Sequence, residues 1–288
     1  VGASAFLDNE TGSYNVGLGY YALKVNTADN NTAVGYAALS ANTTGTNNTS
    51  IGRSALSSNT TGATNTALGQ SALNANTTAN ENVAVGAYAL KVNTTGTQNV
   101  GVGNSALAAN TTATENVAVG YKALLVSTTG NYNTALGAKS LAANTTASDN
   151  TAVGYLALNA NTTGTRNTAL GFSVLDAVTT QSDNTAIGWN ALGANTASEN
   201  TAVGSRALDA NTTGTRNTAV GDLTASANTT STDTTAIGWN ALALSTGEAN
   251  TAVGSRALDA NTTGQYNTAV GDSSLSANTT ASYNTAVG

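Results

Sequence analysis

The sequence of 288 residues contains no histidine, cysteine, proline or methionine, and only 8% of its residues are charged. Without histidine and cysteine there can be no Ser-His-Asp triad, no cysteine nucleophile and no ordinary site for haem, an iron–sulfur cluster or zinc. Without cysteine there are also no disulfides, so the sequence does not report a redox compartment. We therefore expect a protein that is not an enzyme and that binds no metal and no cofactor.

The charged and apolar residues are scattered along the chain and form no runs. The nine basic residues stand singly and the formal net charge is −6, which argues against a nucleic-acid-binding face. The apolar runs are far shorter than the roughly 20 residues that a membrane helix needs. No signal-peptide pattern opens the sequence. We expect neither nucleic acid nor membrane insertion among the partners.

A single repeat occupies the whole sequence. Its consensus, N-T-A-V-G-x-x-A-L-x-x-N-T-T-G-x-x, places a glycine every 16 or 17 residues from Gly2 to Gly288. Such self-similarity is typical of solenoids and other repeat architectures. No linker interrupts the repeat, so we predict one repetitive domain over residues 1–288. Because both ends are in phase with the repeat, we expect this domain to be a segment of a longer fibre.

Three of the units are one residue short, and each loses its residue in the same segment. The segment Asn195–Asn200 is one residue shorter than its counterpart Asn211–Asn217. Deletions are tolerated in exposed connections and not in packed strands. This segment, which we call the corner, is therefore predicted to be the exposed loop of each unit.

The N-T-A-V-G segment alternates as a strand does, so its second and fourth positions share one face. We expect the apolar fourth position to point into a core, and we expect the A-L-x-A segment to form a second short strand that contributes its leucine. Stacked units place like residues on one another. The sequence thus predicts an all-β fold, a parallel β-solenoid (β-roll) of 17 coils with a 17-residue repeat. The predicted core ladder comprises Val34, Ile51, Leu68, Val85, Leu39, Leu56, Leu73 and Leu90.

The asparagine that opens the units and the glycine that recurs in every unit can each be explained by the backbone conformation they favour. The asparagine that opens each unit can form a ladder of stacked amides, although a ligand-binding role for these amides is the alternative. The recurring glycine suits a turn with positive φ or a crowded axis. The predicted asparagine ladder comprises Asn31, Asn48, Asn65 and Asn82, and the predicted turn glycines are Gly35, Gly52, Gly69 and Gly86.

A second asparagine column begins the corner, where N-x-T sequons recur at positions such as Asn42 and Asn59. In a eukaryotic secreted protein these would be glycan acceptors. The simpler explanation is that Asn-Thr-Thr-Gly is good turn chemistry. The sequence is compatible with both explanations.

The third strand position is small in nearly every unit, as is the position before the leucine. If the fourth position points inward, the third points outward, and an outward face that stays small indicates close packing against another chain. We expect a homotrimer with this face as its interface; drift of a tandem duplication without selection is the alternative. The predicted inter-chain face comprises Ala33, Ala38, Ala67 and Ala72.

The segment Asn82–Gly86, N-V-A-V-G, resembles the N-S-V-A-I-G repeat of trimeric autotransporter adhesin heads. The longer form, N-T-A-V-G-Y-x-A-L-x-x-N-T-T-G, is similar to repeats in phage tail-fibre proteins, and the similarity covers the entire chain. The resemblance implies trimers of left-handed parallel β-rolls on a bacterial or virion surface.

From these observations we expect a structural fibre or shaft protein of an extracellular or virion appendage, tail fibre or adhesin-like, that spans distance. Its partners would be copies of itself, in a homotrimer or stacked end to end, and cell-surface glycans. Exposed aromatics such as Trp189 and Trp239, at equivalent positions, could stack on sugars. A self-assembling extracellular surface filament is one alternative. An ice-binding β-solenoid is the other, with a hydroxyl array led by Thr43, Thr60, Thr77 and Thr94.

Overall fold

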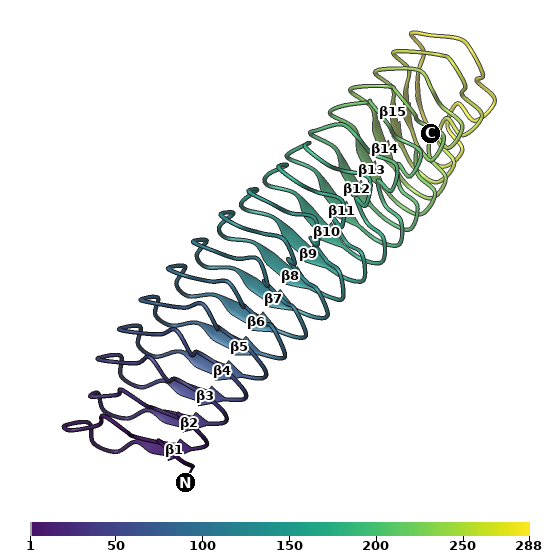
Figure 1. The fold of residues 1–288 in the computed structure, drawn as a ribbon. Coiled ribbons are helices and arrows are strands. Elements are labelled where there is room, and N and C mark those ends of the chain that lie inside the picture. Colours follow the sequence, from purple (N-terminus) through teal and green to yellow (C-terminus); the bar gives the residue numbers. More distant parts are fainter. Residues whose placement is uncertain (1) are drawn as a thin grey trace. The chain divides into compact units, whose positions relative to one another are not determined.

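The structure is a computed structural model that describes residues 2–288. It consists of two compact units, one ending at Ser148 and one comprising Asp149–Gly288. Within each unit the chain winds through successive coils, and each coil contributes one strand (Figure 1). Every paired strand is parallel to its neighbours, and the described residues contain no helix. The predicted all-β, parallel β-solenoid fold is therefore confirmed in both units.

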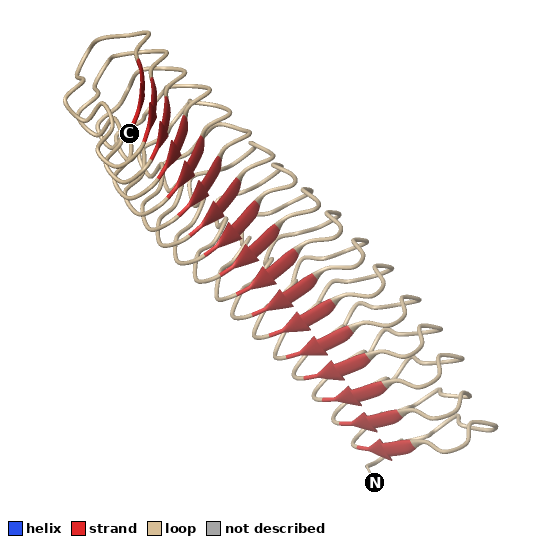
Figure 2. Cartoon of the chain, turned by 180° about the vertical axis from the view of Figure 1, so that it is seen from behind, coloured by secondary structure: helices blue, strands red, loops and turns tan. Residues whose placement is uncertain are grey.

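Residues 2–288 contain seventeen strands, each three residues long. The first unit contains β1 (Val16–Leu18), β2 (Thr32–Val34), β3 (Thr49–Ile51), β4 (Thr66–Leu68), β5 (Val83–Val85), β6 (Val100–Val102), β7 (Val117–Val119) and β8 (Thr134–Leu136). The second unit contains β9 (Thr151–Val153), β10 (Thr168–Leu170), β11 (Thr185–Ile187), β12 (Thr201–Val203), β13 (Thr218–Val220), β14 (Thr235–Ile237), β15 (Thr251–Val253), β16 (Thr268–Val270) and β17 (Thr285–Val287). Within each unit the strands form one column, and turns and loops make up the rest of every coil (Figure 2).

The strands of neighbouring coils pair in register, so each column of a unit holds one kind of residue. Strands β4 and β5, for example, pair Ala67 with Ala84 and Leu68 with Val85. The peptide N–H of Val83 donates to the carbonyl of Asn99 on the following coil at 2.8 Å. Each coil is thus bonded only to the coils before and after it, as in other solenoids.

In the coils that the structure describes, the second strand predicted for the A-L-x-A segment is absent, and a pair of turns replaces it. The N–H of Ala38 donates to the carbonyl of Gly35, and the N–H of Asn42 donates to that of Leu39, each at 3.4 Å. Ala37 and Leu39 have φ of 53° and 51°, in the left-handed region that an extended strand does not enter. Leu39 is nevertheless fully buried, so packing of the side chain compensates for an unfavourable backbone conformation.

The strand residues face the opposite way from the prediction. The middle residue, such as Ala33 or Ala67, has no exposed surface, whereas the residues on either side of it are partly exposed. Ile51 is 40% exposed, and Val34, Leu68 and Val85 are half-buried. These four residues are therefore not part of the core.

The leucine half of the predicted core ladder does lie in the core. Leu39, Leu56, Leu73 and Leu90 are fully buried. These leucines reach from the turn across the inside of the coil, which leaves room for only a small side chain, alanine in most strands, on the inner side of each strand. A bulky residue must then face outward, and this explains the reversal.

Candidate functional site

The opening asparagines form a buried ladder, which Thr234 interrupts in the second unit. Asn31, Asn48, Asn65 and Asn82 have no exposed surface. The Nδ2 of Asn65 donates to Oδ1 of Asn48 at 3.2 Å and to the carbonyl of Ala79 at 2.8 Å, and its peptide N–H donates to the same Oδ1 at 2.9 Å. Because these amides are buried and bonded to one another, they offer nothing to an external ligand.

The asparagines of the sequons form a second buried ladder. The Nδ2 of Asn59 donates to Oδ1 of Asn42 and to the carbonyl of Gly62, each at 2.8 Å. Both asparagines have no exposed surface. The folded coil therefore does not present them to a glycosylating enzyme, and their role in the structure is to hold the corner.

The turn glycines are required by their backbone conformation. Gly35, Gly52, Gly69 and Gly86 have φ of +135°, +136°, +129° and +129°. A β-carbon added to Gly35 would lie 2.5 Å from the carbonyl oxygen of Gly52 on the next coil. Any side chain in this column would collide with the backbone stacked on it.

The inter-chain face predicted from the small residues is wrong. Ala33, Ala38, Ala67 and Ala72 are all fully buried within their own coils. They are small because the leucines fill the interior, and no second chain could contact them while the coil is closed.

The surface that the strands do present consists of two uncharged columns, which we call the strand face. One column holds the threonine or valine that begins each strand, and the other holds the aliphatic residue that ends it. In the second unit every strand begins with threonine and ends with valine, leucine or isoleucine. Several aliphatic members are well exposed, among them Leu136 at 38% and Leu170 at 44%.

The threonine hydroxyls of the strand face differ from those of the corner. Among the residues that the structure describes, no strand threonine donates its hydroxyl to another protein group. In the corner, Oγ1 of Thr43 donates to the carbonyl of Thr60 at 2.9 Å, and Oγ1 of Thr60 donates to that of Thr77 at 3.1 Å. The hydroxyl array expected at Thr43, Thr60, Thr77 and Thr94 is thus committed to backbone carbonyls.

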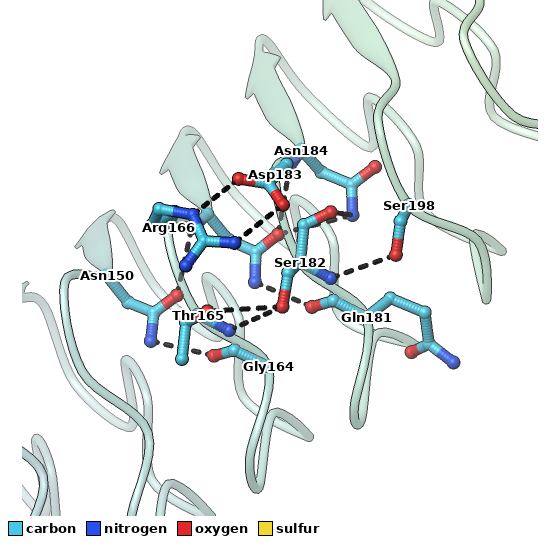
Figure 3. Close-up of polar contacts among 10 residues, drawn as sticks. Asn150, Gly164, Thr165, Arg166, Gln181, Ser182, Asp183, Asn184 and Ser198 are labelled. Atoms are coloured by element: carbon cyan, nitrogen blue, oxygen red, sulfur yellow. Dashed lines mark hydrogen bonds and ion pairs between the residues drawn. The ribbon is translucent and has the colours of Figure 1, made fainter.

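The corner of the second unit also carries ion pairs between coils. Nε and Nη2 of Arg166 bond to the two carboxylate oxygens of Asp183 at 2.6 and 2.9 Å (Figure 3). The hydrogen bond from Arg166 lowers the pKa of Asp183 below its ordinary value. Arg216 and Asp233 form the same pair. Beside the first pair, Oγ of Ser182 accepts the N–H of Thr165 at 2.9 Å (Figure 3).

Among the described residues, six exposed aromatic rings stack on a neighbour, whereas Tyr14, Tyr121, Tyr132 and the two tryptophans do not. The ring centroids of Tyr155 and Phe172 are 5.6 Å apart, and those of Tyr266 and Tyr283 are 5.0 Å apart. Trp189 and Trp239 are 53% and 52% exposed. Within residues 2–288 neither indole is paired with another ring or with a cation.

Between residues 2 and 288 there is no pocket and no group of three or more acidic, histidine or cysteine side chains that could hold a metal ion. The same span has no helix with the length and apolarity needed to cross a bilayer. No protein-family model matches the chain, and no curated protein matches it either.

Proposed function

We propose that the chain is a structural segment of an extracellular or virion fibre, of tail-fibre or adhesin type, with no catalytic role. The observation that supports this is the bonding of each coil to its two neighbours alone, because such a stack lengthens by adding coils. The proposed location rests on the resemblance of the repeat. The absence of histidine and cysteine from the sequence agrees with a scaffold.

Self-association, as a homotrimer, is part of this proposal. The buried alanines leave the strand face as the uncharged surface available to a second copy. Its aliphatic column is continuous through β5, β6 and β7, where Val85, Val102 and Val119 stand on successive coils. Burying apolar surface contributes about 25 cal/mol per Å², and in a cyclic trimer the same column of each chain can face the common three-fold axis.

The test is the molar mass in solution, measured by light scattering on the chain and on two variants. The first variant carries Val85→Lys, Val102→Lys and Val119→Lys on the strand face. The matched control carries Gln70→Lys, Gln98→Lys and Asn104→Lys, three exposed positions elsewhere on the coils.

We expect the chain and the control to have three times the 28.3 kDa of one chain, and the strand-face variant to have 28.3 kDa. A mass of 28.3 kDa for the unmodified chain at every concentration would overturn the trimer. Growth without limit as concentration rises would instead favour the alternative of a stacked filament.

A second candidate function is ice binding, now on the strand face. The observation that favours it is the unbonded hydroxyl column of the second unit, which repeats at about 4.8 Å beside a column of aliphatic groups. A regular array of free hydroxyl and methyl groups can order water. The chain would have to be a monomer that produces thermal hysteresis, and Thr201→Lys with Thr218→Lys would have to abolish it. Absence of hysteresis in a monomer would exclude this candidate.

A further inference from the structure

The second unit contains a larger repeat of three coils. Residues 188–237 and 238–287 align without a gap, because each set has successive coils of 16, 17 and 17 residues. The two sets share several exposed or partly exposed side chains on the turns that follow the glycines. The shared pairs are Trp189 and Trp239, Asn190 and Asn240, Arg206 and Arg256, Asp209 and Asp259, and Asp222 and Asp272.

The corners of the same coils have diverged. Glu199 is replaced by Ala249, Arg216 by Tyr266, and Asp233 by Tyr283. The turns share the tryptophan, arginine and aspartate side chains named above, although other turn positions differ, among them Gly193, which is replaced by Ala243, and Ala194, which is replaced by Leu244.

The shared side chains lie on adjacent turns. The N–H of Arg206 donates to the carbonyl of Trp189 at 2.9 Å, and the N–H of Arg256 donates to that of Trp239 at the same distance. Nε of Arg206 also bonds to Oδ2 of Asp209 at 2.7 Å. This ion pair holds a guanidinium and a carboxylate together on the turn next to the half-exposed indole of Trp189. Around Trp239 the guanidinium of Arg256 donates instead to Oγ of Ser273 at 3.2 Å.

We propose that the surface formed by Trp189, Arg206 and Asp209, and its counterpart around Trp239, each bind a segment of a carbohydrate chain. The indole has a free face that can stack on the apolar face of a pyranose ring. The half-exposed guanidinium of Arg206 can donate hydrogen bonds to sugar hydroxyls, and the Asp209 carboxylate, which is only 11% exposed, fixes its orientation. The stacked tyrosines and phenylalanine are less suited, because their rings cover one another.

This inference rests on the proposed function, since an extracellular fibre meets glycans. Three coils separate the two surfaces, which corresponds to about 14 Å at the strand spacing of about 4.8 Å. One oligosaccharide can therefore span both surfaces, and the second contact then forms at a high effective concentration.

The test uses intrinsic fluorescence, because the chain has only two tryptophans and both belong to the proposed surfaces. The probes are cellohexaose, maltohexaose, chitohexaose and a purified bacterial O-polysaccharide. We expect a saturable change with at least one probe. Calorimetry with that probe should show several-fold weaker binding for Trp189→Ala and for Trp239→Ala, and no binding for the double variant.

The control is Tyr155→Ala, which removes a ring that stacks on Phe172 and should leave binding unchanged. Unaltered thermal melting of the double variant would show that the loss is not unfolding. No saturable change with any of the four probes would overturn the inference, as would a double variant that binds normally. Failure of this inference is distinguishable from failure of the fibre proposal, because the tryptophan variants leave the strand face, and with it the molar mass, unchanged.

Discussion

A β-carbon placed on Gly101 lies 3.4 Å from Cγ of Leu90, in van der Waals contact. Gly101 is the middle residue of β6, and its neighbours in the same column, Ala84 and Ala118, carry that methyl group. The leucine of one coil thus packs against the inner side of a strand on the next. This contact sets the width of the interior and turns the larger strand residues outward.

Gly101→Ala should stabilise the fold by about 0.5–1 kcal/mol, because alanine reduces the entropy of the unfolded chain and fits the column. The nearest atom to the added methyl group would be the carbonyl oxygen of Ala106 at 3.3 Å, which has to yield slightly. The measurement is the free energy of unfolding in urea. The control is Gly103→Ala, whose φ is +131° and whose methyl group would lie 2.5 Å from the carbonyl oxygen of Gly120. Strong destabilisation by Gly101→Ala would contradict the packing described.

Ser127→Asn should repair a break in the second asparagine ladder. Oδ1 of Asn110 and Oγ of Ser127 are buried without a hydrogen-bond partner. An asparagine at position 127 would donate to Asn110 as its counterparts do in other coils, which should stabilise the fold by about 1 kcal/mol. The midpoint of urea unfolding reports the change. Ser58→Asn, at an exposed position, should have little effect. A lower midpoint for Ser127→Asn would refute the ladder explanation.

Thr64→Asn should also stabilise the chain. Thr64 is exposed and has φ of 60°, a conformation that β-branched residues adopt rarely and asparagine tolerates. Asn47 occupies the same column with φ of 59°. We expect the free energy of unfolding to rise by about 0.5–1 kcal/mol, which is a fraction of the cost of placing a residue in the left-handed conformation. Thr66→Asn, in strand β4, should destabilise because asparagine is disfavoured in strands. Equal effects of the two variants on the melting temperature would be inconsistent with this account.

Stability should change little between about pH 6 and 8, since the chain has no histidine. The hydrogen bond from Arg166 lowers the pKa of Asp183, and Arg216 does the same for Asp233. A carboxylate whose pKa is lowered by folding stabilises the fold at pH values above its pKa in the unfolded chain, which is about 3.9 for aspartate. This contribution is lost as the pH falls through the lower pKa of the folded chain. Burial raises the pKa of Asp176, which has the opposite and partly offsetting effect.

The melting temperature should therefore fall only in acid. Arg166→Gln removes the guanidinium that pairs with Asp183, so the pKa of Asp183 would return toward its value in the unfolded chain. The fall in melting temperature in acid should then be slightly smaller. A steep change in melting temperature between about pH 6 and 7 would contradict this prediction, because no carboxylate with an ordinary or lowered pKa titrates there.

Some features of the fold could be predicted because they depend on local backbone needs and on stacking of like residues. The column of Gly35 and the ladder that contains Asn65 are of this kind. The inward side of the strands could not be predicted, because a period of two separates the faces without saying which is inside. Ala84 and Val85 are both apolar, and only the width set by Leu90 decides between them.

The other differences between the sequence-based predictions and the structure have similar causes. The turn around Leu39 could not be predicted because leucine seldom adopts positive φ, and the sequence pattern A-L-x-A is equally typical of a strand. The equivalence of Trp189 and Trp239 is visible in the sequence. That their indole faces are free, while Tyr155 and Phe172 cover each other, required the arrangement of the side chains.

The central claim is that copies of the chain meet through the strand face, and a cysteine introduced there tests it most directly, because the chain has no cysteine of its own. Under mild oxidation Val85→Cys should form a disulfide between chains, visible as a doubled mass on a non-reducing gel. Ala84→Cys, at the buried neighbouring position, should neither cross-link nor react with a thiol reagent until the protein is unfolded. The account would be contradicted if Val85→Cys stayed monomeric and fully reactive, or if Ala84→Cys cross-linked the chains.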